Sequence, residues 1–89
     1  MAKTNVVVET ELKGGAEIRV VLNGKAVPGV NGRHTRAVSG GEQSLLWFVL
    51  GPPGSSYKLE VTEPTNVGFA TAATLDLAGK DHGNTWFTI

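Results

Sequence analysis

The sequence predicts a small all-β domain built as a sandwich of antiparallel strands, and three observations lead to this fold class. Apolar and polar residues alternate along several short segments, as in strands that place one face on a core. Twelve glycines and four prolines punctuate the chain between these segments and mark turns. No window of about 11 residues carries the 3.6-residue apolar period of an amphipathic helix. The 89 residues are expected to form a single domain over residues 1–89.

The amino-terminal part of the chain is expected to contain three strands. Residues 4–12 alternate with one exception, and residues 16–22 alternate more cleanly than any other segment. The Asn-Gly pair at 23–24 suits the positive-φ positions of a type I′ hairpin turn. A short return strand over 25–27 should stop at Pro28 or lie at a sheet edge, because proline has no backbone donor.

The remainder of the chain is expected to add further short strands. These segments are a weak strand at 34–38, an apolar run at 43–50, a clean alternation at 56–63, an Ala- and Thr-rich strand or irregular stretch at 67–77, and a terminal strand at 85–89. Gly-Pro-Pro-Gly at 51–54 ends the apolar run. The polar residues 78–84 are expected to form a loop.

Strands at a spacing of about 8–12 residues are typical of a β-sandwich or a small β-barrel. The order of strands and turns is compatible with an immunoglobulin-like Greek key, and the small β-barrel is the alternative. The chain has no cysteine, so it lacks the sheet-crossing pair that marks antibody domains. This fold analogy says little about function.

Charge and hydropathy argue against two classes of partner. Eight basic residues balance eight acidic ones, so the chain has no long-range field to attract nucleic acid or an anionic membrane. No run of about 18 apolar residues could span a bilayer, and no apolar core of about 7–15 residues marks a signal peptide. We therefore expect neither nucleic acid nor a membrane as partner. The location stays open between the cytoplasm and a mature secreted domain.

The apolar run from residue 45 to residue 50 places large side chains on both faces of a strand, although a half-exposed strand needs only every second one. The two faces are Leu45, Trp47, Val49 and Leu46, Phe48, Leu50. Three coverings are open for the outer face. A loop at 24–32 or 67–73 could fold over it, a second copy or another domain could bury it, or it could line a concave site for an apolar or sugar ligand.

The leading functional prediction follows from the free energy of that exposure. Each large side chain moved out of water contributes about 1.5–3 kcal/mol, and large exposed apolar patches tend to be interfaces. We therefore expect a non-catalytic binding or assembly domain that forms a homo-oligomer. Leu45, Trp47 and Val49, or their opposite-face neighbours, would form the contact. Residues 4–12 are expected to be an edge strand that can pair across the interface.

A carbohydrate-binding module is the second prediction. Its site would comprise Trp86, Asn84, Asp81 and His82 at a loop end, with the indole stacking on a sugar ring. Trp86 is expected to point outward because Phe87 and Ile89 share the opposite face of their strand. The alternative for Trp86 is packing on Trp47, in the core or in an oligomer contact.

A small metal-dependent hydrolase is the third prediction, with loops that carry His34 and His82 meeting beside Asp81. The alternative is that both histidines are solvated loop residues. The chain has no His-x-His or His-x-x-x-His pair, no Gly-x-Ser-x-Gly and no phosphate-binding glycine loop. We therefore expect a protein that is not an enzyme and that needs no metal or cofactor.

Overall fold

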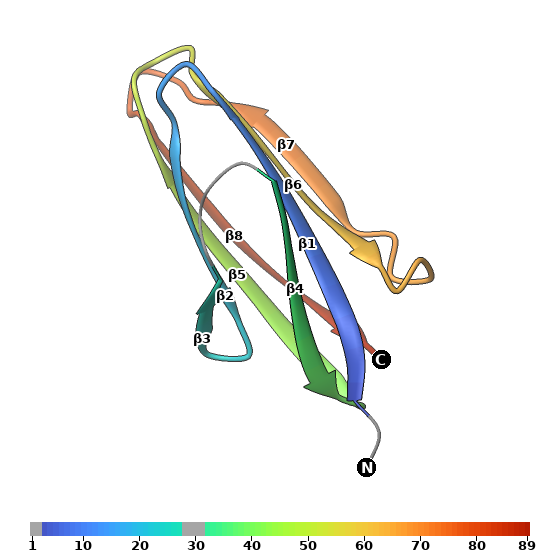
Figure 1. Cartoon of the computed structure of the whole chain (residues 1–89). Coiled ribbons are helices and arrows are strands. Elements are labelled where there is room, and N and C mark those ends of the chain that lie inside the picture. Colours follow the sequence, from blue (N-terminus) through green and yellow to red (C-terminus); the bar gives the residue numbers. More distant parts are fainter. Residues whose placement is uncertain (1–2, 28–31) are drawn as a thin grey trace.

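The computed structural model of the protein describes residues 3–27 and 32–89, and this part of the chain forms eight strands (Figure 1). The strands are β1 (Lys3–Lys13), β2 (Glu17–Leu22), β3 (Lys25–Val27), β4 (Gly32–Ser39), β5 (Glu42–Leu50), β6 (Ser56–Glu63), β7 (Ala70–Thr74) and β8 (Lys80–Thr88). The predicted effect of Pro28 on β3 falls on residues outside the described ranges.

The strands form two four-stranded antiparallel sheets that pack face to face as a sandwich, which confirms the all-β sandwich. Sheet A has the order β4-β1-β6-β7, and sheet B has the order β3-β2-β5-β8. Neither sheet closes into a barrel, so the small β-barrel alternative is not adopted. Only β2–β3 and β6–β7 are consecutive strands that pair, and every other connection passes from one sheet to the other.

Alternating side chains of the two sheets meet in one core between them. The fully buried side chains at its centre are Val6, Val8, Val20, Leu22, Leu45, Val49 and Leu59. They come from β1, β2, β5 and β6, the four strands that have a neighbour on each side. The central position of these strands explains why their inward faces are apolar without exception from Leu45 to Val49 and from Tyr57 to Val61.

The hairpin between β2 and β3 forms as its sequence predicts. Asn23 and Gly24 have φ values of 52° and 78°, which are the two left-handed positions of a type I′ turn. The Asn23 side chain also accepts a hydrogen bond from the Ser44 backbone N–H at 2.9 Å and donates one to the Gln43 side chain. These bonds join the turn to β5.

Two expectations about strands are wrong. Residues 4–12 do not lie at a sheet edge, because β1 pairs with β4 on one side and with β6 on the other. Residues 78–84 are not all loop, because β8 begins at Lys80, which pairs with Leu50. An alternating pattern shows that a strand has a buried face, but it does not show how many neighbours pair with that strand. The polar residues of β8 are instead explained by its exposed face.

The aromatic centre of the core depends on one glycine. The Trp47 ring lies against the backbone of Gly83 on the neighbouring strand β8, and it also contacts the Phe69 ring, at 5.4 Å between ring centroids. A Cβ atom added at Gly83 would lie 2.3 Å from Trp47 Cζ2, a distance that real contacts do not reach. Gly83 therefore provides the space that the indole ring needs.

Gly83→Ala should destabilise the fold by about 1–3 kcal/mol, because the buried Trp47 ring would have to move. Denaturant unfolding followed by tryptophan fluorescence measures this change. Gly40→Ala is the matched control, since a Cβ atom there would meet only Ile89 O at 3.8 Å. Equal stability of the Gly83→Ala variant and the wild type would contradict the packing described for Trp47.

Candidate functional site

The outer face of sheet A is charged. Arg33 Nε lies 3.8 Å from Glu9 Oε1, and Lys58 Nζ lies 3.5 Å from Glu60 Oε1. These pairs are largely exposed, and pairs of this kind contribute little to stability. The charged side chains do make this face of sheet A well solvated.

The outer face of sheet B is different, because β5 shows large apolar side chains there. The inward triplet Leu45, Trp47 and Val49 is at most 6% exposed and belongs to the core of this chain. The opposite-face neighbours point outward, and the exposed fractions are 50% for Phe48 and 59% for Leu50. A contact surface on β5 would therefore use Leu46, Phe48 and Leu50, and not the first triplet.

Strand register places further side chains beside this apolar column. Leu46 lies between Val21 on β2 and Asn84 on β8, and further along β8 the exposed Trp86 pairs with Ser44. We call Val21, Leu46, Phe48, Leu50 and Trp86 the apolar face of sheet B. These side chains point away from the core, because they occupy the outward positions of their strands.

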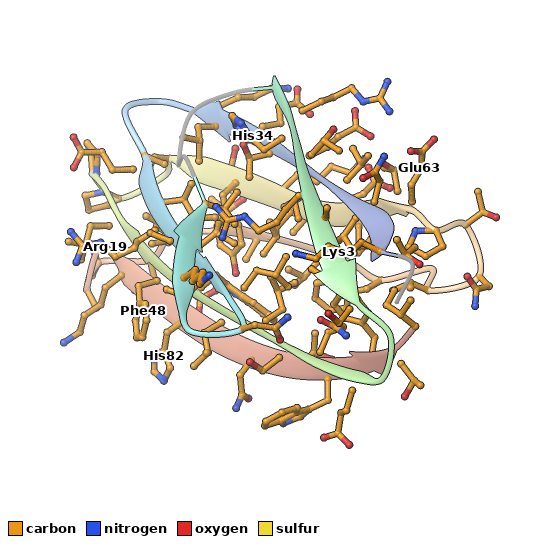
Figure 2. The ribbon with its side chains drawn as sticks, turned by 60° about the horizontal axis from the view of Figure 1, so that its bottom comes forward. Lys3, Arg19, His34, Phe48, Glu63 and His82 are labelled. Atoms are coloured by element: carbon orange, nitrogen blue, oxygen red, sulfur yellow. The ribbon has the colours of Figure 1, made fainter. Side chains whose placement is uncertain are left out.

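Charged and polar side chains flank the apolar column on both sides. Phe48 lies between Arg19 on β2 and His82 on β8, and its ring stacks on the His82 imidazole with 6.4 Å between centroids. Figure 2 shows these three side chains together on one side of the molecule. In the next row, Leu50 lies between Glu17 and Lys80.

A groove with a volume of about 440 Å³ lies at the β2–β5 side of this surface, lined by Glu17, Ile18, Arg19, Phe48 and Leu50. Its volume falls in the range of small-molecule pockets, and the charged side chains among its lining residues are Glu17 and Arg19. Trp86 and Asn84, two of the residues predicted for sugar binding, do not line it.

The segments expected to cover the outer face of β5 lie elsewhere. Val67 and Phe69 pack against the core, and β7 joins sheet A, so residues 67–73 do not cover Phe48. In the loop at 24–32, residues 28–31 lie outside the described ranges. Lys25 and Ala26 belong to β3 at the far edge of sheet B, on the other side of β2.

The four residues predicted to bind a sugar are divided between the two faces of β8. Trp86, Asn84 and His82 point outward, and Trp86 is 63% exposed, as the alternation of this strand predicts. Trp86 does not pack on Trp47, whose ring contacts Phe69. Asp81 is on the inward face, because these residues form a strand and not the predicted loop.

Asp81 connects the two sheets. Its Oδ2 accepts a hydrogen bond from Tyr57 Oη on β6 at 2.7 Å, and its Oδ1 accepts one from the His82 backbone N–H at 2.8 Å. Burial raises the pKa of Tyr57 above its ordinary value of 10.0, and the hydrogen bond and negative charge of Asp81 raise it further. Asp81 is therefore a structural hydrogen-bond acceptor at this end of the sandwich.

The two histidines of the predicted metal site do not converge. His34 is on β4 and His82 is on β8, the edge strands of different sheets. Arg36 of β4 donates hydrogen bonds to the carbonyls of β3, so β4 lies beside the β3 edge of sheet B and away from β8. Figure 2 shows His34 and His82 on opposite sides of the molecule. Over the described ranges, no three His, Cys, Asp or Glu side chains gather in a way that could hold a metal ion.

Phe48 and Leu50 are the residues that sequence reasoning did not place first. A fully apolar run has no alternation that distinguishes its two faces. The signal lies just before the run, where Glu42 and Ser44 share the face of Leu46. Two polar residues on one face indicate that this face is the outer one, although Gln43 on the other face weakens the pattern.

Comparisons with protein-family models, curated proteins and solved structures found no match to this chain. The described residues contain no helix long and apolar enough to cross a bilayer.

The raised pKa of Tyr57 predicts how stability depends on alkaline pH. As the pH rises above 10.0, the unfolded chain releases the tyrosine proton first, so the free energy of unfolding should fall until the folded pKa is passed. Below pH 10.0 this contribution stays constant. Tyr57→Phe should remove that part of the decline in denaturant unfolding at alkaline pH.

Tyr57 is the only tyrosine in the chain, so phenolate absorbance reports its ionisation directly. Asp81→Asn is the companion variant, and it should lower the pKa of Tyr57 because it removes the negative charge. A folded wild-type protein that titrates at or below 10.0 would contradict the Tyr57–Asp81 contact described above.

Proposed function

We propose that this chain is a non-catalytic assembly domain that forms homo-oligomers through the apolar face of sheet B. The observation that carries the proposal is the outward column of Leu46, Phe48 and Leu50, in which the last two are half exposed or more. Complete burial of an exposed large side chain contributes about 1.5–3 kcal/mol, so a half-exposed one gains about half of this. A second copy of the same face offers an apolar surface of matching size.

The charges beside the column favour one mode of contact between two copies. Two sheets that pack face to face about a two-fold axis parallel to their strands place β2 of each copy over β8 of the other. Phe48 then lies near Phe48 of the second copy, and Glu17 lies over Lys80 of the second copy, because both flank Leu50. Opposite charges meet at the rim and apolar side chains meet at the centre, as in specific interfaces.

Phe48→Glu should weaken self-association by about thirtyfold or more, because it places a charge at the centre of the contact. Sedimentation equilibrium or light scattering over a concentration series measures the change in dissociation constant. Ala72→Glu is the matched control, since it adds the same charge to an exposed position of sheet A. A wild-type protein that is monomeric at about 100 μM would remove the proposal.

Charge exchange tests the mode of contact. Glu17→Lys and Lys80→Glu should each weaken association, and the double variant should restore it, because the pair would then face each other with reversed signs. If Phe48→Glu prevents association while the two charge variants do not, the copies meet through this face in a different orientation.

We also propose that the strands are connected as an immunoglobulin-like Greek key. Its support is the pairing of strands that are distant in sequence, such as β1 with β6 and β2 with β5. The fourth strand of a Greek key likewise reaches its neighbour through a long connection.

A carbohydrate-binding module is the second candidate, and the exposure of Trp86 beside Asn84 and His82 favours it. The indole would stack on a sugar ring, and the two polar side chains would bind its hydroxyls. Asp81 would take no part, since its carboxylate bonds to Tyr57.

A sugar titration followed by tryptophan fluorescence should change the emission of the wild type, since Trp86 is exposed while the only other tryptophan, Trp47, is buried. The signal should be absent in Trp86→Ala, which keeps the core indole as an internal reference. An unchanged spectrum across a broad panel of glycans would remove this candidate.

A further inference from the structure

The outer edge of β8 presents backbone groups in a regular pattern. β8 is the last strand of sheet B and pairs only with β5 in the described residues. Ile89 exchanges two backbone hydrogen bonds with Gly41, and Gly79 O accepts one from Gly51 N, so the odd-numbered residues of this segment direct their polar groups toward β5. Because the pattern of an antiparallel pair alternates, the N–H and C=O groups of the even-numbered residues point away from β5.

Other sheet edges carry protection of the kind that prevents strand addition. β3 has three residues, and Arg36 of β4 donates hydrogen bonds to Lys25 O and Ala26 O at 3.3 and 2.8 Å. Arg36 points inward from β4, so it also disfavours the addition of a strand at the β4 edge. The fourth edge strand, β7, is only five residues long. Short edges and inward charged residues are known protective features. β8 has nine residues and lies at the remaining edge.

Asp81 protects only the first part of β8. Its Oδ1 accepts the hydrogen bond of the outward His82 N–H, and its Oδ2 is held by Tyr57 Oη. In the described part of the chain, no hydrogen bond is made by the outward backbone groups of Asn84, Trp86 and Thr88. The edge from Asn84 to Thr88 is therefore open.

We propose that this open edge pairs with the same segment of a second copy, antiparallel and centred on Trp86. A two-fold axis through the Trp86 pair places Asn84 opposite Thr88 of the second copy. All of these residues direct their backbone N–H and C=O groups away from β5 and toward the second copy. The Trp86 pair and the two Asn84–Thr88 pairs can therefore form about six hydrogen bonds. The donors of each strand meet the acceptors of the other, and this register leaves the occupied N–H of His82 outside the contact.

The side chains favour a second copy of this chain as the occupant. In this register Trp86 stands beside Trp86 of the second copy on the same face, and adjacent aromatic side chains across strands stabilise a sheet. The pairing also joins two apolar faces of sheet B into one continuous surface. It does not bury Phe48 or Leu50, which point out of the plane of the sheet, so it is separate from the face-to-face contact proposed above.

Amide hydrogen exchange measured by NMR tests the edge pairing, and the Phe48→Glu variant is used so that face-to-face contact is absent. The amides of Trp86 and Thr88 should exchange at least about tenfold more slowly at about 1 mM than at about 50 μM protein. The amides of Thr85 and Phe87 point toward β5 and serve as internal controls, which should be protected equally at both concentrations.

Thr88→Pro, added to Phe48→Glu, is the matched edge variant. It removes an outward N–H that β5 does not use, so the fold should remain while the concentration-dependent protection of Trp86 is lost. Exchange at Trp86 that is fast and independent of concentration in Phe48→Glu would overturn the edge pairing, whatever the wild type does through its apolar face. Association of the wild type that Phe48→Glu does not weaken, together with slow exchange at Trp86 at high concentration, would instead overturn the face-to-face contact and support the edge.

Discussion

The insertion of Trp47 between Gly83 and Phe69 fixes the pairing of sheet B and thereby the face that β5 turns outward. Side chains of a strand alternate with period two, so an inward Trp47 requires inward Leu45 and Val49 and outward Phe48 and Leu50. A slip of one residue would exchange the two triplets. It would also remove the indole from Gly83, the one glycine of β8, whose missing Cβ leaves room for it. The apolar exterior of the molecule is thus a consequence of how its core is packed.

The two outer faces of the sandwich have opposite character, and this asymmetry favours association through one of them. Sheet A carries Glu9, Arg33, Lys58 and Glu60, whose solvation would be lost in an apolar contact. Sheet B exposes Phe48 and Leu50, which water solvates poorly. The net charge of zero adds no long-range repulsion between two copies. Contact through the apolar face would therefore remove the unfavourable exposure of these side chains to water.

Alternation along the chain was sufficient to predict β1, β2 and β6, and the Asn-Gly pair was sufficient to predict the turn at 23–24, because both signals depend on neighbouring residues. It could not predict that β1 is central, since both of its partners come from later in the chain. The polar segment 80–84 suggested a loop because an exposed edge strand and a loop have the same composition. The inward direction of Asp81 was missed for the same reason. The choice of face on β5 depends on pairing with β2 and β8, which a uniformly apolar run does not encode.

The inward carboxylate of Asp81 both stabilises the fold and limits how far a strand can be added along the edge of β8. Its two oxygens satisfy Tyr57 Oη across the sandwich and the His82 N–H at the edge, so the side chain is fixed by two elements at once. An added strand that reached His82 would have to displace this carboxylate and leave the tyrosine hydroxyl without its acceptor, which is costly in a buried position. Beyond Asp81 the edge has no such device, and the inward positions of β8 are taken by Gly83, Thr85 and Phe87. The position of a single charge therefore separates the part of β8 that stays closed from the part that is free to pair.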